Sequence, residues 1–357
     1  MKEEPLCIDK KKEEMFNSDK DNNTPTEQIL PDHISLEKSK MYFISDLHIG
    51  DGSYSEPLRK KELLIKFLRM VQEEDAQLVL VGDGLDLHQA FHGLSSIIEG
   101  NSKIFTQLRS MNSFHYVRGN HDHDMTILQG LIEFSLHNEP VVDNKIHVQH
   151  GHQYDPYISN NLEESSLFTI FHHLTERILN CQFRLPIENH YNFENRCAFW
   201  FFHKLVIATE FITKINSYLG WKDRIKGLRD FFHHWSMNQV SDPANIFENV
   251  RAECLKSKYP FLLVGHSHFP GKITFSNGNT YVNTGSWTWN SSQYAVWNGT
   301  DIEVRDFDSG QIYTDSSYKD LSQRVSHHLD FLKWWNENYM GWLRFRNAEY
   351  RRYPRQQ

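Results

Sequence analysis

Five short apolar stretches, each followed at once by polar residues, organise this chain. Each has the pattern of a short buried strand that ends in Asp, Asn or His, usually beside glycine. The stretches are Tyr42–His48, Leu78–Asp86, His115–Asp122, Ile146–His152 and Phe261–His268. In open α/β sheets, ligands collect outside the carboxyl ends of the strands. The five ends therefore predict a single polar site rather than five unrelated loops.

The polar residues at these ends are of the types that bind metal ions. They form the motifs D-x-H, G-D-x-x-D, G-N-H-D, H-G-H and G-H-x-H, in that order along the chain. Residues i and i+2 of an extended chain point to the same side. Asp46 and His48 can therefore bind one ion together, and the same spacing places His266 and His268 on one side of their strand.

The content and order of these motifs resemble the calcineurin-like metallophosphoesterases, over residues 41–155 and 244–310. The resemblance implies an α/β fold, a four-layer αββα sandwich. It also implies two divalent metal ions, with Asp83 as the ligand that bridges them. The complete implied ligand set is Asp46, His48, Asp83, Asn120, His150, His266 and His268. Nitrogen and oxygen ligands suit manganese, which we rank first, as well as iron, cobalt or zinc.

The resemblance further implies hydrolysis of a phosphoester or pyrophosphate bond by a hydroxide that bridges the two metals. We expect His121 to be the catalytic acid or a phosphate-stabilising residue, since histidine titrates near neutral pH. Asp122 is expected to orient His121 or a neighbouring imidazole, although a simple turn-forming role explains it nearly as well. For Asp86 and His152, contact with the site and its absence are equally expected. The remaining histidines of this region lack motif support: His88, His115, His123 and His147.

Two features limit what can be said about the substrate. In layout the chain is most similar to UDP-diacylglucosamine pyrophosphatases, which typically have arginine where this chain has His121. Protein Ser/Thr phosphatases usually have arginine at the position of Leu87. The motifs therefore predict the reaction but not the physiological substrate.

The apolar periodicity predicts the elements of a domain over residues 41–318. Helices are expected at Leu58–Glu74, at about Leu94–Met111 and from Asp242-Pro243 onward. The first connects two strands, which predicts a parallel β-α-β unit. Further short strands are expected at Lys272–Phe275, Thr280–Thr284, Tyr294–Trp297 and Ile302–Arg305, with Asn-Gly turns between them.

Residues 160–240 form a predicted helical cap insertion, which holds fifteen aromatic residues in eighty-one positions. We expect it to cover the site and to bind an apolar group of the substrate, such as a lipid-linked nucleotide. The alternative is that these aromatic residues form only the core of the cap itself.

The two ends of the chain differ from this domain in composition. Residues 1–40 are charged and polar and are expected to be a disordered leader. Residues 319–357 combine a tryptophan-rich amphipathic helix with a basic tail, which predicts either peripheral membrane contact or packing on the domain. Four cysteines without C-x-x-C spacing favour a cytoplasmic location. The net charge of −8 argues against a nucleic-acid partner.

Three functions from different classes remain at this point. The first is an active metal-dependent phosphoesterase, and the complete set of ligand motifs favours it. The second is a scaffold that keeps the fold without turnover. The third is a nuclease, which the acidic charge disfavours. The sequence does not predict the oligomeric state.

Overall fold

The computed structural model describes most of residues 32–155 and 243–314 and part of residues 170–227. Positions 54–55, 91, 123–124 and 289–290 are excepted, and residues 1–31 and 315–357 lie outside the description. All described residues belong to the unit that begins at Asp32. The predicted C-terminal amphipathic helix therefore falls outside the described residues.

The first sheet has seven strands in the order β13-β12-β11-β2-β3-β4-β5. Its strands are β2 (Met41–Ile44), β3 (Gln77–Val81), β4 (Phe114–Val117), β5 (Ser135–His137), β11 (Gln293–Trp297), β12 (Ile302–Asp306) and β13 (Ile312–Tyr313). Strands β2 to β5 run parallel, and β11 joins β2 in the antiparallel direction. The parallel pairing of β2 with β3 confirms the predicted β-α-β unit.

The second sheet has six strands in the order β1-β6-β7-β8-β10-β9. Its strands are β1 (His33–Ile34), β6 (Val141–Val142), β7 (Ile146–Val148), β8 (Phe261–Val264), β9 (Gly271–Thr274) and β10 (Thr280–Asn283). The motif strands β7 and β8 are parallel neighbours. The antiparallel pair β9 and β10 flanks the Asn277-Gly278-Asn279 turn, as the sequence predicts. Strands β1, β5, β6 and β13 are too short to show a periodicity in the sequence.

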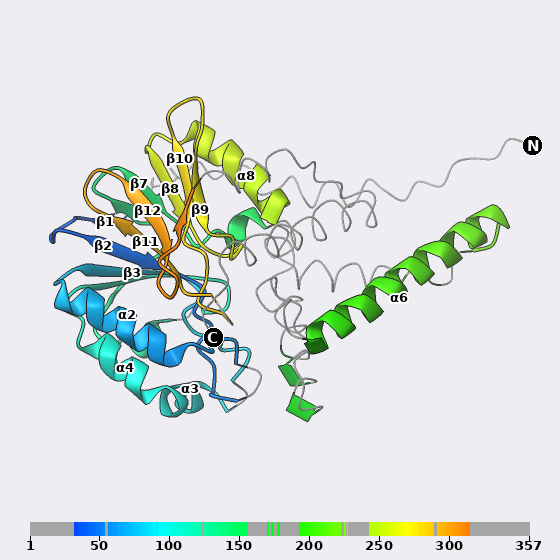
Figure 1. Ribbon diagram of the computed structural model, residues 1–357, viewed down its shortest axis with the longest axis horizontal. Coiled ribbons are helices and arrows are strands. Elements are labelled where there is room, and N and C mark those ends of the chain that lie inside the picture. The colour runs from blue at the N-terminus through cyan, green and yellow to red at the C-terminus, as the bar shows by residue number, and fades with distance from the viewer. Residues whose placement is uncertain are drawn as a thin grey trace, which may run out of the picture. The chain divides into compact units, whose positions relative to one another are not determined.

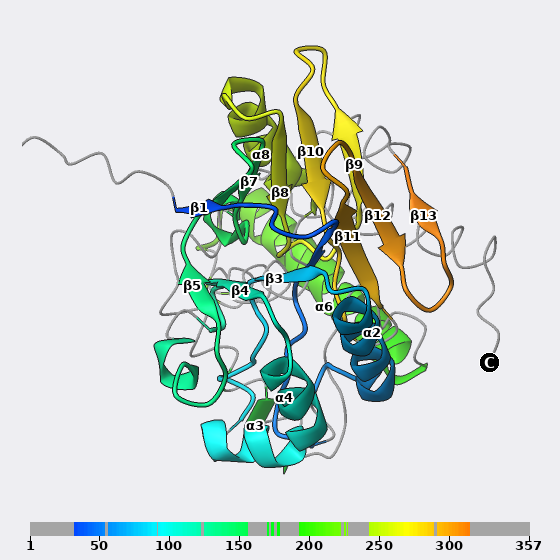
Figure 2. The ribbon, with the colours of Figure 1, turned by 90° about the vertical axis from the view of Figure 1, so that its left-hand side faces the viewer.

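Helices and sheets stack in four layers (Figures 1 and 2). Apolar side chains of both sheets, among them Phe43, Val79 and Leu263, share one buried cluster between the sheets. The opposite face of the seven-stranded sheet packs with helices α2 (Lys61–Glu73), α3 (Leu94–Gly100) and α4 (Ser102–Arg109) in a second cluster. Helix α8 (Pro243–Lys256) packs its Phe247 ring against Tyr281 of β10, with the ring centroids 5.4 Å apart. The structure thus confirms the predicted αββα sandwich.

Two predicted helices are confirmed and a third is divided. Helix α2 buries the apolar stripe that the sequence predicts, and α8 begins at Pro243. The expected helix at Leu94–Met111 is instead two helices, because Asn101 leaves the helical conformation with φ −133°. Its side-chain amide donates hydrogen bonds to the carbonyl groups of Gly50 at 2.7 Å and Ile97 at 3.0 Å. The bond to Gly50 connects the junction between the two helices to the loop after β2.

The fold begins earlier than the sequence analysis expects. The composition predicts a leader over residues 1–40, but His33–Ile34 form β1, which pairs in parallel with β6. Ile34 is buried in the cluster between the sheets. A single buried side chain and two strand residues are too little for a recognisable sequence pattern.

Part of the predicted cap is described. It contains helix α6 (Phe193–Tyr218) and helical residues at positions 170, 173, 174, 177 and 178. Short 3-10 helices also occur at Met125–Leu128 and His152–Tyr154. Within the described residues, every helix falls short of the length or the apolar character that crossing a bilayer requires.

Candidate metal centre

The loops that follow β2 and β3 lie side by side and are joined by backbone hydrogen bonds. The N–H of Asp46 donates to the carbonyl of Gly82 at 3.1 Å, and the N–H of His48 donates to that of Asp83 at 2.9 Å. A further parallel bridge joins Ile49 to Leu85. The D-x-H and G-D-x-x-D motifs therefore meet because their strands are parallel neighbours whose pairing continues into the loops.

Many of the predicted ligands have an unusual backbone conformation. Five of the seven have positive φ: Asp46 at 52°, His48 at 46°, Asp83 at 50°, His266 at 63° and His268 at 52°. Such a conformation costs a non-glycine residue on the order of 1–3 kcal/mol and gathers at functional sites. The loops turn these side chains away from the strand direction and toward one another.

The two carboxylate oxygens of Asp46 have different partners, a backbone N–H group for one and imidazole rings for the other. Its Oδ2 accepts the backbone N–H of His266 at 2.9 Å. Its Oδ1 lies 3.2 Å from Nε2 of His268 and 3.9 Å from Nε2 of His48. The side chain is fully buried. One oxygen is thus held by the backbone while the other faces two nitrogen ligands.

Asp83 shows the same division. Its Oδ1 accepts the backbone N–H of His121 at 2.9 Å. Its Oδ2 lies 3.3 Å from Nε2 of His150 and 3.8 Å from Nε2 of His48. Burial alone would raise the pKa of Asp83, but the charges of His150 and His121 hold it well below its usual range. This carboxylate stands between two groups of imidazoles.

The structure also brings His150 and Asn120 together. Nδ1 of His150 lies 2.8 Å from the carbonyl oxygen of Val81. A carbonyl only accepts, so Nδ1 carries the proton and Nε2 is left to face Asp83 and Asn120. The distance from Nε2 to Oδ1 of Asn120 is 3.1 Å. His266 completes this side, with its ring centroid 5.2 Å from that of His150.

These residues fit a pair of metal ions. One group with ligand atoms within 4.8 Å of one another comprises Asp46, His48 and His268, and a second comprises Asp83, His150 and His266. Within the described part of the chain, the buried Oδ1 of Asp46 lacks a hydrogen bond of good geometry. Burial lowers the pKa of His48, which keeps its ring neutral, as a metal ligand must be. Buried carboxylates and imidazoles directed at a shared space are the donor set for a divalent cation.

His121 lies beside these groups and contacts Asp86. Nδ1 of His121 is 3.2 Å from Oδ1 of Asp86, and its ring centroid is 4.8 Å from that of His48. Burial alone would raise the pKa of Asp86, but the charge and hydrogen bond of His121, together with hydrogen bonds of His173 and His48, hold it well below its usual range. The carboxylate that meets His121 is therefore that of Asp86, which the sequence left undecided.

Asp122 has different partners from those the sequence analysis expects. Its carboxylate accepts backbone N–H groups of Gly119 at 3.0 Å and Leu85 at 3.1 Å, and a short hydrogen bond from the Tyr116 hydroxyl. Burial and the charge of Asp83 raise the pKa of Asp122 to about 6. These contacts join the loops after β3 and β4, and the bond from Gly119 is of the turn-forming kind that the sequence analysis gave as the alternative role of Asp122.

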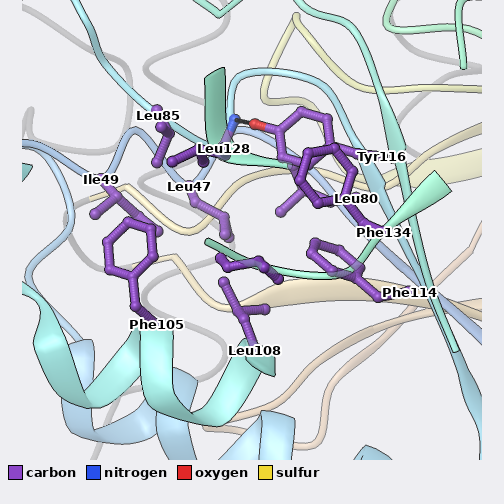
Figure 3. A pocket seen from close by; sticks show the side chains of 12 residues that line it. Leu47, Ile49, Leu80, Leu85, Phe105, Leu108, Phe114, Tyr116, Leu128 and Phe134 are labelled. Carbon is purple, nitrogen blue, oxygen red and sulfur yellow. Dashed lines mark hydrogen bonds between the residues drawn. The ribbon is translucent and has the colours of Figure 1, made fainter. Parts of the chain in front are cut away.

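A small apolar cavity lies next to these loops (Figure 3). Its walls include Leu47 and Leu85 from the motif loops, Phe105 from α4 and the ring of Tyr116. Tyr116 also accepts the backbone N–H of Gly84 at 3.1 Å. The apolar lining indicates that this space belongs to the packing that supports the loops, and not to the polar centre.

Three contacts near the centre come from residues that the sequence analysis passed over or left open. Asp155 lies with Oδ2 3.1 Å from Nε2 of His266. His173, in the insertion, reaches Asp86. The ring of His152, which the sequence left open, lies with its centroid 5.5 Å from that of His150. Asp155 follows the H-G-H motif closely, and that is the one signal that could have identified it. His173 has no such signal.

The histidines without motif support lie at several different places in the fold. The His88 ring lies 5.4 Å from that of His121, so His88 is closer to the centre than expected. His115 on β4 pairs with His137, and His147 on β7 lies 3.7 Å from Glu139. His123 lies outside the described residues.

Comparison with known proteins assigns the family. Residues 39–270 match the model of the calcineurin-like phosphoesterases. The match covers more than half of the chain, and the fold and the motif order agree with it. The protein is therefore a member of the calcineurin-like phosphoesterase family. The chain matches none of the curated proteins.

Solved structures with some likeness come from several organisms. A predicted phosphoesterase of Streptococcus pneumoniae is 12% identical, covering 77% of this chain and 92% of that one, with a TM-score of 0.31. A dimetal phosphatase of Danio rerio is 15% identical, covering 75% and 95%, with a TM-score of 0.37. Vacuolar Protein Sorting 29 of Cryptosporidium parvum is 14% identical, covering 77% and 94%, with a TM-score of 0.31. At these scores the likeness adds nothing to the family assignment.

Proposed function

We propose that the protein is a dinuclear-metal-dependent phosphoesterase that hydrolyses a phosphoester or pyrophosphate bond. The observation that carries the proposal is the position of Asp83, whose Oδ2 faces His48 at 3.8 Å on one side and His150 at 3.3 Å on the other. One carboxylate shared by two ligand groups can hold two ions at a fixed separation. We assign Asp46, His48 and His268 with Asp83 to one ion, and Asn120, His150 and His266 with Asp83 to the other.

Two bound divalent ions would supply an activated water and neutralise charge on the phosphoryl oxygens. The chain itself supplies the remaining elements. His121 is placed beside His48 and can give a proton to the leaving oxygen. Asp86 accepts from Nδ1 of His121, which fixes the ring so that Nε2 is directed away from this carboxylate. The backbone N–H groups of His121 and His266 hold the two ligand carboxylates in position.

We further propose that the substrate carries an apolar group. Supporting this, apolar side chains of the insertion are exposed, including Phe211, Ile212 and Ile215 on α6 and Trp221 after it. A polar mononucleotide would not require such a surface. Manganese as the metal, a cytoplasmic location and membrane contact through residues 319–357 stay as proposals from the sequence alone.

The test is a screen of chromogenic phosphate monoesters and diesters with added Mn²⁺, Fe²⁺, Co²⁺ or Zn²⁺, combined with metal analysis. Asp83→Ala should lower bound metal and reduce turnover by several orders of magnitude, while the fold persists because β3 itself is unchanged. Asp301→Asn, an exposed aspartate paired with Lys272, is the matched control and should behave as the wild type. Wild-type protein that binds two metals without turnover would support the scaffold alternative. An Asp83→Ala variant with normal metal content would refute the ligand assignment.

A further inference from the structure

The Asp86 carboxylate lies between two different parts of the centre. Its Oδ1 faces His121 at 3.2 Å, and its Oδ2 lies 3.6 Å from Nδ1 of His48. The side chain is fully buried. This carboxylate therefore lies against both the proposed acid and a proposed metal ligand.

A third imidazole reaches the same carboxylate from the insertion. Nε2 of His173 lies 3.6 Å from Oδ2 of Asp86. His173 is fully buried, although neighbouring insertion residues such as Leu174 and Ile178 are 43% and 72% exposed. The insertion thus turns a polar side chain inward, against Asp86, and leaves apolar side chains outside.

Arg177 holds the same segment in place. Its guanidinium forms an ion pair with Asp51 and donates a hydrogen bond to the carbonyl of Gln89 at 3.0 Å. Arg177 thus contacts the loop after β2 through Asp51, and both His173 and Arg177 contact the loop after β3.

We infer that His173 is a positioning residue for the proposed reaction and that Arg177 anchors it. His173 fixes the Oδ2 side of Asp86, so that Oδ1 stays aligned with His121. The insertion is then part of the catalytic machinery and not only a cover. This inference rests on the proposed function, because its catalytic consequence exists only if His121 acts as an acid.

The test uses a matched pair of substitutions, His173→Gln and His173→Met. The two new side chains are of similar length, but only Gln keeps an N–H donor near the place of Nε2. His173→Met should lower kcat for ethyl phosphate about tenfold, in the range seen when outer partners of an active site are removed, and should change para-nitrophenyl phosphate turnover little. His173→Gln should recover most of the loss. In the His121→Ala background, His173→Met should add no further loss.

Two further measurements separate the possible failures. The exposed and polar Lys214→Ala variant of α6 in the same insertion is the control and should keep wild-type kinetics. A thermal-unfolding cycle of Asp86→Asn and His173→Met should show a combined Tm loss smaller than the sum of the single losses, whether or not the protein hydrolyses esters. Additive Tm losses, equal kinetic losses for both esters, or failure of His173→Gln to recover activity would overturn the inference. Absence of wild-type turnover with non-additive Tm losses would instead refute the proposed function.

Discussion

The backbone N–H of His266 donates a hydrogen bond to Oδ2 of Asp46 at 2.9 Å, although 220 residues separate the two. Asp46 follows β2 of the seven-stranded sheet, and His266 follows β8 of the six-stranded sheet. The bond therefore joins the ends of two different sheets. It holds one oxygen of a proposed ligand and places the side chain of another, so the centre is assembled where the two sheets meet.

The close approach at Gly119 predicts that this position tolerates no side chain. A Cβ atom there would lie 2.1 Å from Oδ1 of Asp83 and 2.4 Å from its backbone nitrogen. Gly119→Ala should therefore displace Asp83, reduce bound metal and lower turnover at least tenfold. Gly130→Ala is the control, since a Cβ at Gly130 meets nothing within 4 Å. The measurement is the metal content of both variants. Normal metal content in Gly119→Ala would contradict the prediction.

If His121 protonates the leaving group, its loss should depend on the basicity of that group. His121→Ala should lower turnover of alkyl esters by about 10²–10⁴-fold and affect aryl esters far less, because phenolates leave without a proton. Metal content should change little. The exposed His92→Ala variant is the control. A loss of equal size across a series of leaving groups would assign His121 to substrate binding.

The exposed apolar residues of the insertion predict a dependence on substrate chain length. Each buried methylene is worth about 0.8 kcal/mol, so kcat/KM should rise by up to about fourfold per methylene until the surface is filled. The assay compares phosphodiesters that differ only in acyl length. Phe211→Ser, which changes a side chain that is 63% exposed, should flatten the response. A flat response in the wild type would favour a small polar substrate.

The pair formed by His115 and His137 predicts loss of stability in mild acid. Nδ1 of His115 lies 3.2 Å from Nε2 of His137. Burial and the charge of His137 lower the pKa of His115 from 6.5 to about 4. Between these values the unfolded chain binds a proton that the folded chain does not, so stability is complete above pH 6.5 and falls as the pH drops toward 4.

Proton linkage at His115 should lower the free energy of unfolding by about 2 kcal/mol at pH 5. This value is an upper one, because water still reaches the half-buried ring. His115→Gln, which does not titrate, should unfold in urea with a weaker pH dependence than the wild type between pH 7.5 and 5. At pH 7.5 the same comparison measures the effect of the substitution itself. Identical pH slopes for the two proteins would show that His115 does not contribute.

Much of the fold follows from local sequence patterns. The strands β2, β3, β4, β7 and β8 and the helices α2 and α8 are found where apolar periodicity and Asp-Pro capping predict them. The short strands are different. Strand β1 has two residues, and its place depends on pairing with β6 and on burial of Ile34 between the sheets. Such pairing is decided by distant parts of the chain.

The sequence by itself determined which residues end the motif strands, because metal-binding side chains and glycines recur there at fixed spacings. It could not determine their partners. Asp122 accepts hydrogen bonds from a backbone N–H group and from Tyr116, whereas Asp86 contacts the ring of His121. The conformation of each loop decides which carboxylate faces which ring. His173 meets Asp86 only in the folded chain. Contacts between segments that far apart depend on how the layers pack, and no local pattern encodes them.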